Sequence, residues 1–175
     1  MHLEVVTRKP QSNLRPTPLL FVHGAWHGAW CWEEHFLPYF AQHGYTSYAF
    51  DLRGHGKSEG ADRLGWTSIA NYVSDVSQVV SQLERPPVLI AHSLGGLVVQ
   101  KYLEAHQAPA AVLMASIPPS GVIRTALSIA VRHPLHFLKG NLTLKLYPIV
   151  ETPQLTREMF FSATMPEEKV NAYFN

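Results

Sequence analysis

Short apolar runs alternate with amphipathic stretches over the first two thirds of the chain. Four largely apolar runs, at residues 19–24, 46–54, 88–93 and 110–116, are bounded by glycine, proline or polar turn residues. Runs of this length and setting are typical of strands buried inside a sheet. A further strand is predicted at residues 3–8, ahead of a proline-rich turn region.

Helices are predicted between these strands. The clearest covers residues 68–83, where apolar residues step by three and four and so share one side of a helix. A serine or threonine is available at its start as an N-cap. Residues 94–106 also predict a helix. A third is expected at residues 30–43, although Pro38 should kink or split it.

Strands that alternate with helices predict an α/β fold. The expected architecture is a doubly wound, mostly parallel sheet with helices on both faces. In such sheets the functional site lies beyond the carboxyl ends of the strands. From residue 121 onward the pattern predicts helices without strands. We therefore expect residues 1–120 to form the N-terminal part of the core, and residues 121–175 a helical lid or cap of the same, incomplete domain.

Composition and charge narrow the classes of protein. Fourteen basic and thirteen acidic residues give a net charge of +1, which does not favour nucleic acid as a partner. Cys31 is the single cysteine, so no intrachain disulfide can form and a reducing compartment is favoured. The N-terminus resembles no secretory signal, and no apolar stretch approaches the ~20 residues of a membrane span. We interpret the chain as cytoplasmic, without stable membrane insertion.

Candidate chemistry begins with the run A-H-S-L-G-G at residues 91–96, between a predicted strand and a predicted helix. A serine on such a sharp turn projects its hydroxyl above the sheet, and the turn needs small neighbours. Ser93 is therefore the candidate nucleophile, with alanine at the first glycine position of the G-x-S-x-G pattern. The alternative is an ordinary N-cap serine on a glycine-rich turn.

A second motif, H-G-A-W at residues 23–26, follows the first buried strand. A loop at this place brings a backbone N–H beside the serine, where two such donors can stabilise an oxyanion. We assign the donors to the backbone N–H groups of Ala25 and Leu94. His23 is expected to orient this loop.

Three motifs in order, HGAWHGAWCW, DLRGHGKS and AHSLGG, resemble the α/β-hydrolase superfamily. The first is similar to plant-type methylesterases, and the second to esterases, lipases and haloperoxidase-like members. The resemblance implies the α/β-hydrolase fold and a serine hydrolase that transfers the acyl group of a carboxylic ester through Ser93. Its substrates would be small apolar esters. Asp51, Arg53 and His55, in the second motif, are interpreted as structural.

Trp26, His27 and His92 flank the two loops and are predicted to line the substrate pocket. Core packing is the alternative for the tryptophan, and an exposed loop position for His27. His92 precedes the nucleophile and is poorly placed to act as its base. No zinc-ligand spacing, G-x-G-x-x-G motif or Walker loop is present in the sequence, so no metal or cofactor is expected.

The resemblance also implies that an acid and then a histidine follow the nucleophile in the chain. After residue 116 the acids and histidines all fall in the predicted helical region, with both histidines before every acid; they are His133, His136, Glu151, Glu158, Glu167 and Glu168. We therefore expect the triad acid and base beyond residue 175, together with the last strands of the sheet. The chain alone is predicted to be inactive. The alternative is a non-catalytic ligand-binding or inactive short form of the fold.

Overall fold

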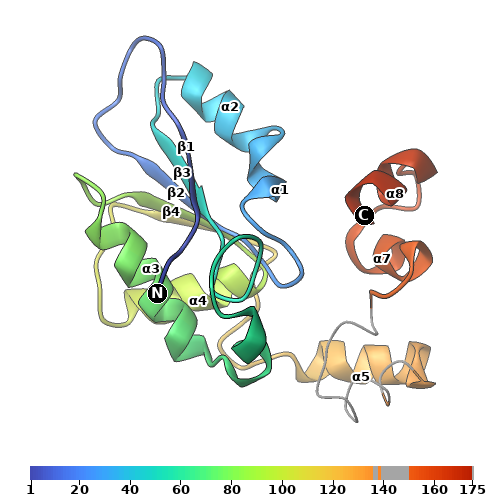
Figure 1. Ribbon diagram of the computed structural model, residues 1–175. Coiled ribbons are helices and arrows are strands. Elements are labelled where there is room, and N and C mark those ends of the chain that lie inside the picture. The colour runs from blue at the N-terminus through green and yellow to red at the C-terminus, as the bar shows by residue number, and fades with distance from the viewer. Residues whose placement is uncertain (136–137, 139–149, 175) are drawn as a thin grey trace. The chain divides into compact units, whose positions relative to one another are not determined.

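The computed structural model describes residues 1–135, 138 and 150–174. The chain forms two compact units, Met1–Gly121 and Val122–Asn175. The first holds a sheet with flanking helices, and the second contains only helices in its described residues (Figure 1). Each unit is described by itself below.

The sheet of the first unit has five strands in the order β1-β3-β2-β4-β5. Their bounds are Val5–Arg8 for β1, Leu19–Val22 for β2, Ser47–Phe50 for β3, Val88–His92 for β4 and Ala111–Met114 for β5. β1 runs antiparallel to β3, and every other neighbouring pair is parallel. The predicted α/β class and mostly parallel sheet are confirmed.

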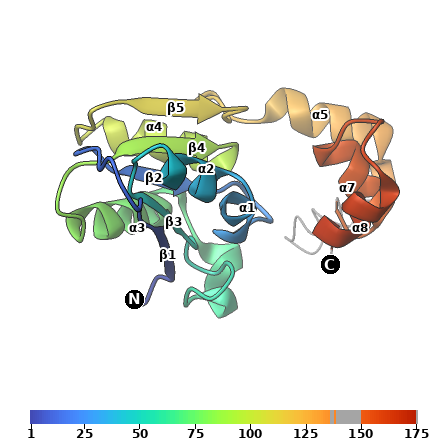
Figure 2. The same ribbon diagram turned by 90° about the horizontal axis from the view of Figure 1, so that it is seen from above.

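Alternation along the strands divides the core between the two faces of the sheet. One apolar cluster contains Leu20 and Val22 of β2 and packs with helices α3 (Ile69–Ser81) and α4 (Leu94–Leu103). The alternate residues of β2, Leu19 and Phe21, belong to a second cluster on the opposite face, with the helices α1 (Trp30–Glu33) and α2 (Phe36–Gln42). Figures 1 and 2 show these helices on either side of the sheet.

The expected helix at residues 30–43 is two helices, α1 (Trp30–Glu33) and α2 (Phe36–Gln42). The break falls at residues 34–35, so the position of the predicted split is wrong. Pro38 lies in the first turn of α2, where a missing N–H removes no intrahelical hydrogen bond.

The predicted helix at residues 68–83 is confirmed as α3. Ser68 caps it in a capping box, in which its hydroxyl accepts from the N–H of Asn71 at 3.2 Å and Asn71 returns a bond to the N–H of Ser68. A short 3-10 helix, η1 (Ala61–Trp66), precedes it. The capping box at Ser68 marks the end of the loop that follows β3.

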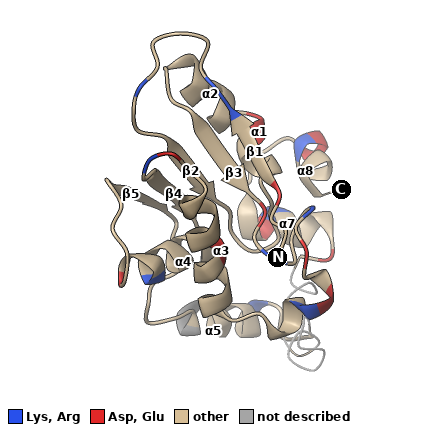
Figure 3. Cartoon of the chain, turned by 60° about the vertical axis from the view of Figure 1, so that its left-hand side comes forward, with Lys and Arg blue, Asp and Glu red and all other residues tan. Residues whose placement is uncertain are grey.

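The strand β5 forms one edge of the sheet and contacts only β4 as a strand partner. Val112 and Leu113 are 48% and 42% exposed although they are large and apolar. Figure 3 shows that β5 carries no charged residue. Taken by itself, the described first unit therefore has an apolar sheet edge at β5.

The second unit contains the helices α5 (Ile123–Arg132), α7 (Pro153–Phe160) and α8 (Glu167–Phe174), and no strand in its described residues. α7 packs against α8. The hydroxyl of Thr152 caps α7 by accepting from the N–H of Leu155 at 3.2 Å. That this segment acts as a lid stays a prediction. No helix in the described part of either unit is long and apolar enough to cross a bilayer.

Candidate active site

Ser93 occupies a sharp turn between β4 and α4. Its backbone angles are φ 52° and ψ −116°, a region that residues with side chains rarely adopt. Two backbone hydrogen bonds hold Ser93 in this turn. Its N–H donates to the carbonyl of Met114 at 3.0 Å, and its carbonyl accepts from the N–H of Ile117 at 3.1 Å. The neighbouring backbone thus holds the serine in a strained conformation.

Close backbone approach explains the small residues after the serine. A Cβ on Gly95 would lie 2.5 Å from the carbonyl oxygens of Val22 and His23, and a Cβ on Gly96 would collide with the hydroxyl of Ser116. Only glycine fits at these two places. The alanine at position 91 is fully buried and is accommodated in β4.

The loop after β2 runs directly against the serine. A Cβ on Gly24 would lie 3.0 Å from both the Cβ of Ser93 and the Nδ1 of His92. Trp26, two residues on, has a φ of 61°. Within the described residues, the N–H groups of Ala25 and Leu94 donate to no other atom. Both stay open to an acceptor from outside the chain.

His23 joins this loop to the loop after β3. Its ring is fully buried, with Nε2 accepting from the N–H of Leu52 at 3.0 Å and Nδ1 lying 2.7 Å from the carbonyl oxygen of Gly24. Because Nε2 accepts, the proton of the neutral ring resides on Nδ1 and is donated to Gly24. Burial lowers the pKa of His23 to about 4, so the ring is neutral at physiological pH.

The neutral state of His23 predicts how stability depends on pH. In the unfolded chain the pKa of His23 is about 6.5, and the ring takes up a proton as the pH falls below this value. In the folded chain the ring takes up a proton only near pH 4. The neutral ring therefore contributes fully to the stability of the fold above pH 6.5. Roughly 3 kcal/mol of stability is lost as the pH falls from 6.5 to about 4. Urea unfolding across this window should show the loss.

Two variants and one titration check the pH prediction. His23→Asn keeps a donor near Gly24 and should flatten the dependence, whereas His35→Gln, at an exposed position, should leave it unchanged. An NMR titration of the His23 ring tests the same point without a variant. A ring that protonates near pH 6.5 in the folded protein would contradict it.

The loop at residues 51–58 is held by its own charged groups. The carboxylate of Asp51 accepts from the N–H of Ala29 at 2.7 Å and from the N–H of Lys57 at 2.8 Å. Arg53 forms a bidentate pair with the fully buried Asp75, with its Nε and Nη2 at 2.9 and 2.6 Å from Oδ1. These partners support the structural interpretation of this motif.

The first strand is tied to the same loop. The carbonyl of Glu4 accepts from the N–H of Asp51 at 3.0 Å, and the hydroxyl of Ser58 donates to the carbonyl of Asp51 at 2.6 Å. The N–H of Glu4 in turn donates to the Ser58 hydroxyl at 2.9 Å. Through Asp51 and His23, this network reaches the loop beside Ser93.

Two of the three residues predicted to line a pocket, His27 and His92, belong to one aromatic cluster. The ring of His27 stacks on Trp30 at 5.7 Å and meets the edge of His92 at 5.9 Å, while its Nδ1 lies 2.7 Å from the carbonyl oxygen of Ala25. Burial lowers the pKa of His92, and the charge of His27 lowers it further. Trp30 is one of the tryptophans that bracket the loop in the sequence, and its ring joins this cluster through His27.

Other conspicuous side chains lie in the core. Trp32 is buried against Phe21, with ring centroids 5.1 Å apart. Burial raises the pKa of the Cys31 thiol to about 12, so it is protonated and unreactive at neutral pH. No group of three or more potential metal ligands occurs among the residues that the structure describes.

The acids and histidines after residue 116 include one pair. The Nε2 of His133 lies 3.0 Å from Oε2 of Glu158, and Arg132 lies 3.7 Å from the same carboxylate. Sequence order gave no sign of this contact, which joins the end of α5 to α7. His136 lies outside the described residues. That the acid and base of a triad follow residue 175 stays a prediction.

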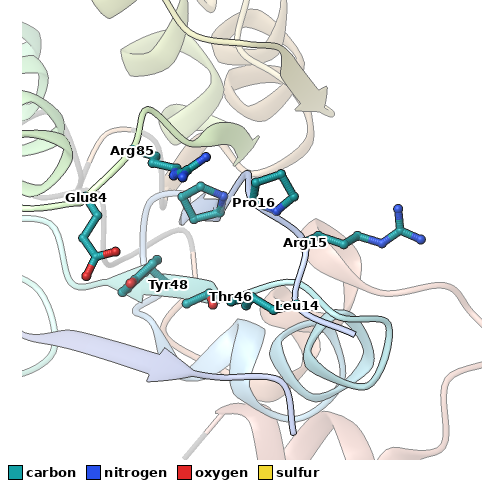
Figure 4. A pocket seen from close by; sticks show the side chains of 8 residues that line it. Leu14, Arg15, Pro16, Thr46, Tyr48, Glu84 and Arg85 are labelled. Carbon is teal, nitrogen blue, oxygen red and sulfur yellow. The ribbon is translucent and has the colours of Figure 1, made fainter. Parts of the chain in front are cut away.

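A pocket of about 280 Å³ lies at the opposite end of the sheet (Figure 4). Most of its lining residues precede strands, among them Pro18 before β2, Thr46 before β3 and Arg85 before β4. Ser93 follows β4, and these three strands are parallel. This pocket is therefore separate from the candidate active site.

Residues 19–174 match the model of the alpha/beta hydrolase family. The strand order, the turn at Ser93 and this match agree, and the chain belongs to that family.

Curated relatives match about half of the chain. A non-heme chloroperoxidase of Streptomyces lividans is 35% identical over 106 residues, which cover 58% of this chain and 37% of that protein. Methylesterase 3 of Arabidopsis thaliana is 33% identical over 85 residues, covering 47% of this chain and 32% of the relative. The matched part of this chain thus spans about a third of the length of each.

Solved structures resemble the chain over a greater length. A monoacylglycerol lipase of Paleococcus ferrophilus has a TM-score of 0.56 at 25% identity, covering 77% of this chain and 53% of the lipase. An esterase of Exiguobacterium antarcticum has a TM-score of 0.64 at 19% identity and covers 99% of this chain and 62% of the esterase. The second likeness shows the shared fold alone.

Proposed function

We propose that the chain is part of a serine hydrolase that acts on carboxylic esters. The observation that carries the proposal is the strained turn at Ser93 with Gly24 packed against its Cβ. A strained non-glycine residue between a strand and a helix, beside a second loop with open N–H groups, is the arrangement that acyl transfer needs.

In the proposed reaction, Ser93 Oγ attacks the ester carbonyl and its proton passes to a base. The carbonyl oxygen becomes an oxyanion, which the N–H groups of Ala25 and Leu94 stabilise. Collapse expels the alcohol, which takes up the proton, and leaves an acyl group on Ser93. Water then attacks this ester, and the acid and free Ser93 are regenerated.

Small apolar esters are the proposed substrates. His27, His92 and Trp30 offer ring surfaces beside the nucleophile, and Trp26 lies in the adjoining loop. Esterases and a lipase among the similar proteins support this class. The single cysteine supports a reducing compartment, and we propose the cytoplasm.

A ligand-binding member without turnover is the alternative. It is favoured by one observation: within the described hydrogen bonds, the Ser93 hydroxyl has no histidine partner. An unassisted serine hydroxyl is a weak nucleophile at neutral pH. We propose that the triad acid and base are supplied by chain beyond residues 1–175.

Labelling by a fluorophosphonate probe tests the nucleophile. In a form of the protein that contains the base, we expect the probe to modify Ser93, as located by peptide mass spectrometry. Ser93→Ala should abolish labelling, and Ser120→Ala, at an exposed position in the same unit, should leave it intact. Labelling that persists unchanged in Ser93→Ala would remove Ser93 as the nucleophile.

A further inference from the structure

The turn that contains Ala25 is strained at Trp26. It is closed by the N–H of His27, which donates to the carbonyl of Gly24 at 3.4 Å. Trp26 lies at the third position of this turn with a φ of 61°, a conformation that favours glycine or asparagine there. A closing bond of this length is weak. Further contacts are therefore needed to hold the Ala25 N–H in one direction.

Two histidine rings bind the carbonyl groups on either side of Ala25. The Nδ1 of His23 lies 2.7 Å from the carbonyl oxygen of Gly24, and the Nδ1 of His27 lies 2.7 Å from that of Ala25. Because a carbonyl oxygen can only accept, each ring has its proton on Nδ1 and donates it. The first carbonyl shares a peptide group with the Ala25 N–H, and the second belongs to the next peptide group. The two rings thus hold the backbone on both sides of the Ala25 α-carbon.

His27 is itself fixed by its neighbours. Its ring stacks on Trp30, with centroids 5.7 Å and planes 17° apart, and meets the edge of His92 at 5.9 Å. The chain directly after it is anchored, because the N–H of Ala29 donates to the carboxylate of the buried Asp51 at 2.7 Å. The Nδ1–H donor of His27 is therefore preorganised, and it can hold the strained turn in place.

We propose that His27 is a positioning residue for the oxyanion donor at Ala25, an inference that rests on the proposed hydrolase function. Its Nδ1–H holds the Ala25 carbonyl and, through the backbone, sets the direction of the Ala25 N–H. The oxyanion forms only when Ser93 attacks, so a misdirected donor weakens the transition state more than substrate binding. Loss of the His27 donor should therefore lower kcat and leave KM nearly unchanged.

His27 also offers ring surface beside the nucleophile, and the two contributions depend on different parts of its side chain. Phenylalanine keeps a ring that can stack on Trp30 but has no donor. Asparagine has no ring, but its side-chain amide can donate from the place of Nδ1. The two substitutions therefore separate positioning of the loop from contact with the substrate.

Steady-state hydrolysis of a p-nitrophenyl ester by a catalytically competent form of the protein tests the inference. We expect His27→Phe to lower kcat by about tenfold or more, with KM within about threefold of the unchanged protein. His27→Asn should keep kcat within a few-fold, and any effect of the lost ring should appear in KM. The same two substitutions at His35, an exposed position, are the matched controls and should change neither parameter.

The position of the ring proton can be measured without catalysis. In the 175-residue chain at about pH 9, where histidine side chains are neutral, the ring nitrogen shifts of His27 should report a proton on Nδ1. The backbone amide signals of Ala25 and Trp26 should move in His27→Phe and less so in His27→Asn. A proton found on Nε2 of His27 overturns the inference.

The kinetic outcomes separate this inference from the proposed function. If the unchanged competent form shows no hydrolysis that depends on Ser93, the hydrolase function is wrong and the inference falls with it. If it shows such hydrolysis and kcat of His27→Phe is near normal, only the inference is overturned. An equal loss of kcat in His27→Phe and His27→Asn also overturns it, because the donor is then not the property that matters.

Discussion

Replacing Ala25 with proline lowers kcat by about 10²–10³-fold in a catalytically competent form of the protein. Proline has no backbone N–H, so the variant removes one of the two donors proposed for the oxyanion. In the described structure this N–H makes no bond that folding needs. The measurement is the steady-state hydrolysis of a p-nitrophenyl ester, with thermal unfolding followed in parallel.

Ala25→Gly is the matched control, because it keeps the N–H and removes only a methyl group. We expect its kcat to stay within a few-fold of the unchanged enzyme, on the order of 1 kcal/mol or less. Near-normal kcat in Ala25→Pro would show that the second donor lies elsewhere, with Trp26 the next candidate.

The 175-residue chain alone is expected to hydrolyse no ester through Ser93 and to self-associate. Among the described hydrogen bonds of the first unit, none joins the Ser93 hydroxyl to a histidine. β5 pairs with a strand on one side only, Val112 and Leu113 are exposed, and the strand itself carries no charged residue. An open apolar edge without charged residues is a site where other chains can pair.

Sedimentation velocity measures the association, and an ester panel with Ser93→Ala measures the activity. Val112→Lys places a charge on the edge and should shift the chain towards monomer, whereas Trp66→Lys, exposed but away from the sheet, should not. Multiple turnover that depends on Ser93 in a monodisperse monomer would falsify the expectation. His92, His133 and His136 would then become the candidate bases.

The sheet could be predicted because its signals are local. The side chains of β2 are all buried and alternate between two clusters, and glycine, proline or a polar loop bounds each strand. α3 could be predicted equally well, because the spacing of its apolar residues and its N-cap Ser68 lie within one segment. The helix predicted at residues 30–43 is split, but not at Pro38. Pro38 lies in the first turn of α2, where a proline does not interrupt the helix.

Some contacts of the site could not be predicted from the sequence and were seen only in the structure. Register aligns Val22 with Phe50 on one side and Ala91 on the other, which sets the loops after the three strands at one edge. The motifs predicted that these loops meet but not how they are joined. The bond from Leu52 to His23 and the contact of His133 with Glu158 each link residues more than twenty positions apart, and no periodicity reports such pairs.

The conformation of Ser93 sets a limit on engineering. Its backbone region is one that glycine occupies freely and other residues adopt at a cost of about 1–3 kcal/mol. A sequence optimised for thermal stability alone would therefore carry glycine at position 93 and lose its nucleophile. Consensus or computational stabilisation of this protein should leave residues 91–96 unchanged and seek its gains in the surface helices, where stability and chemistry do not compete.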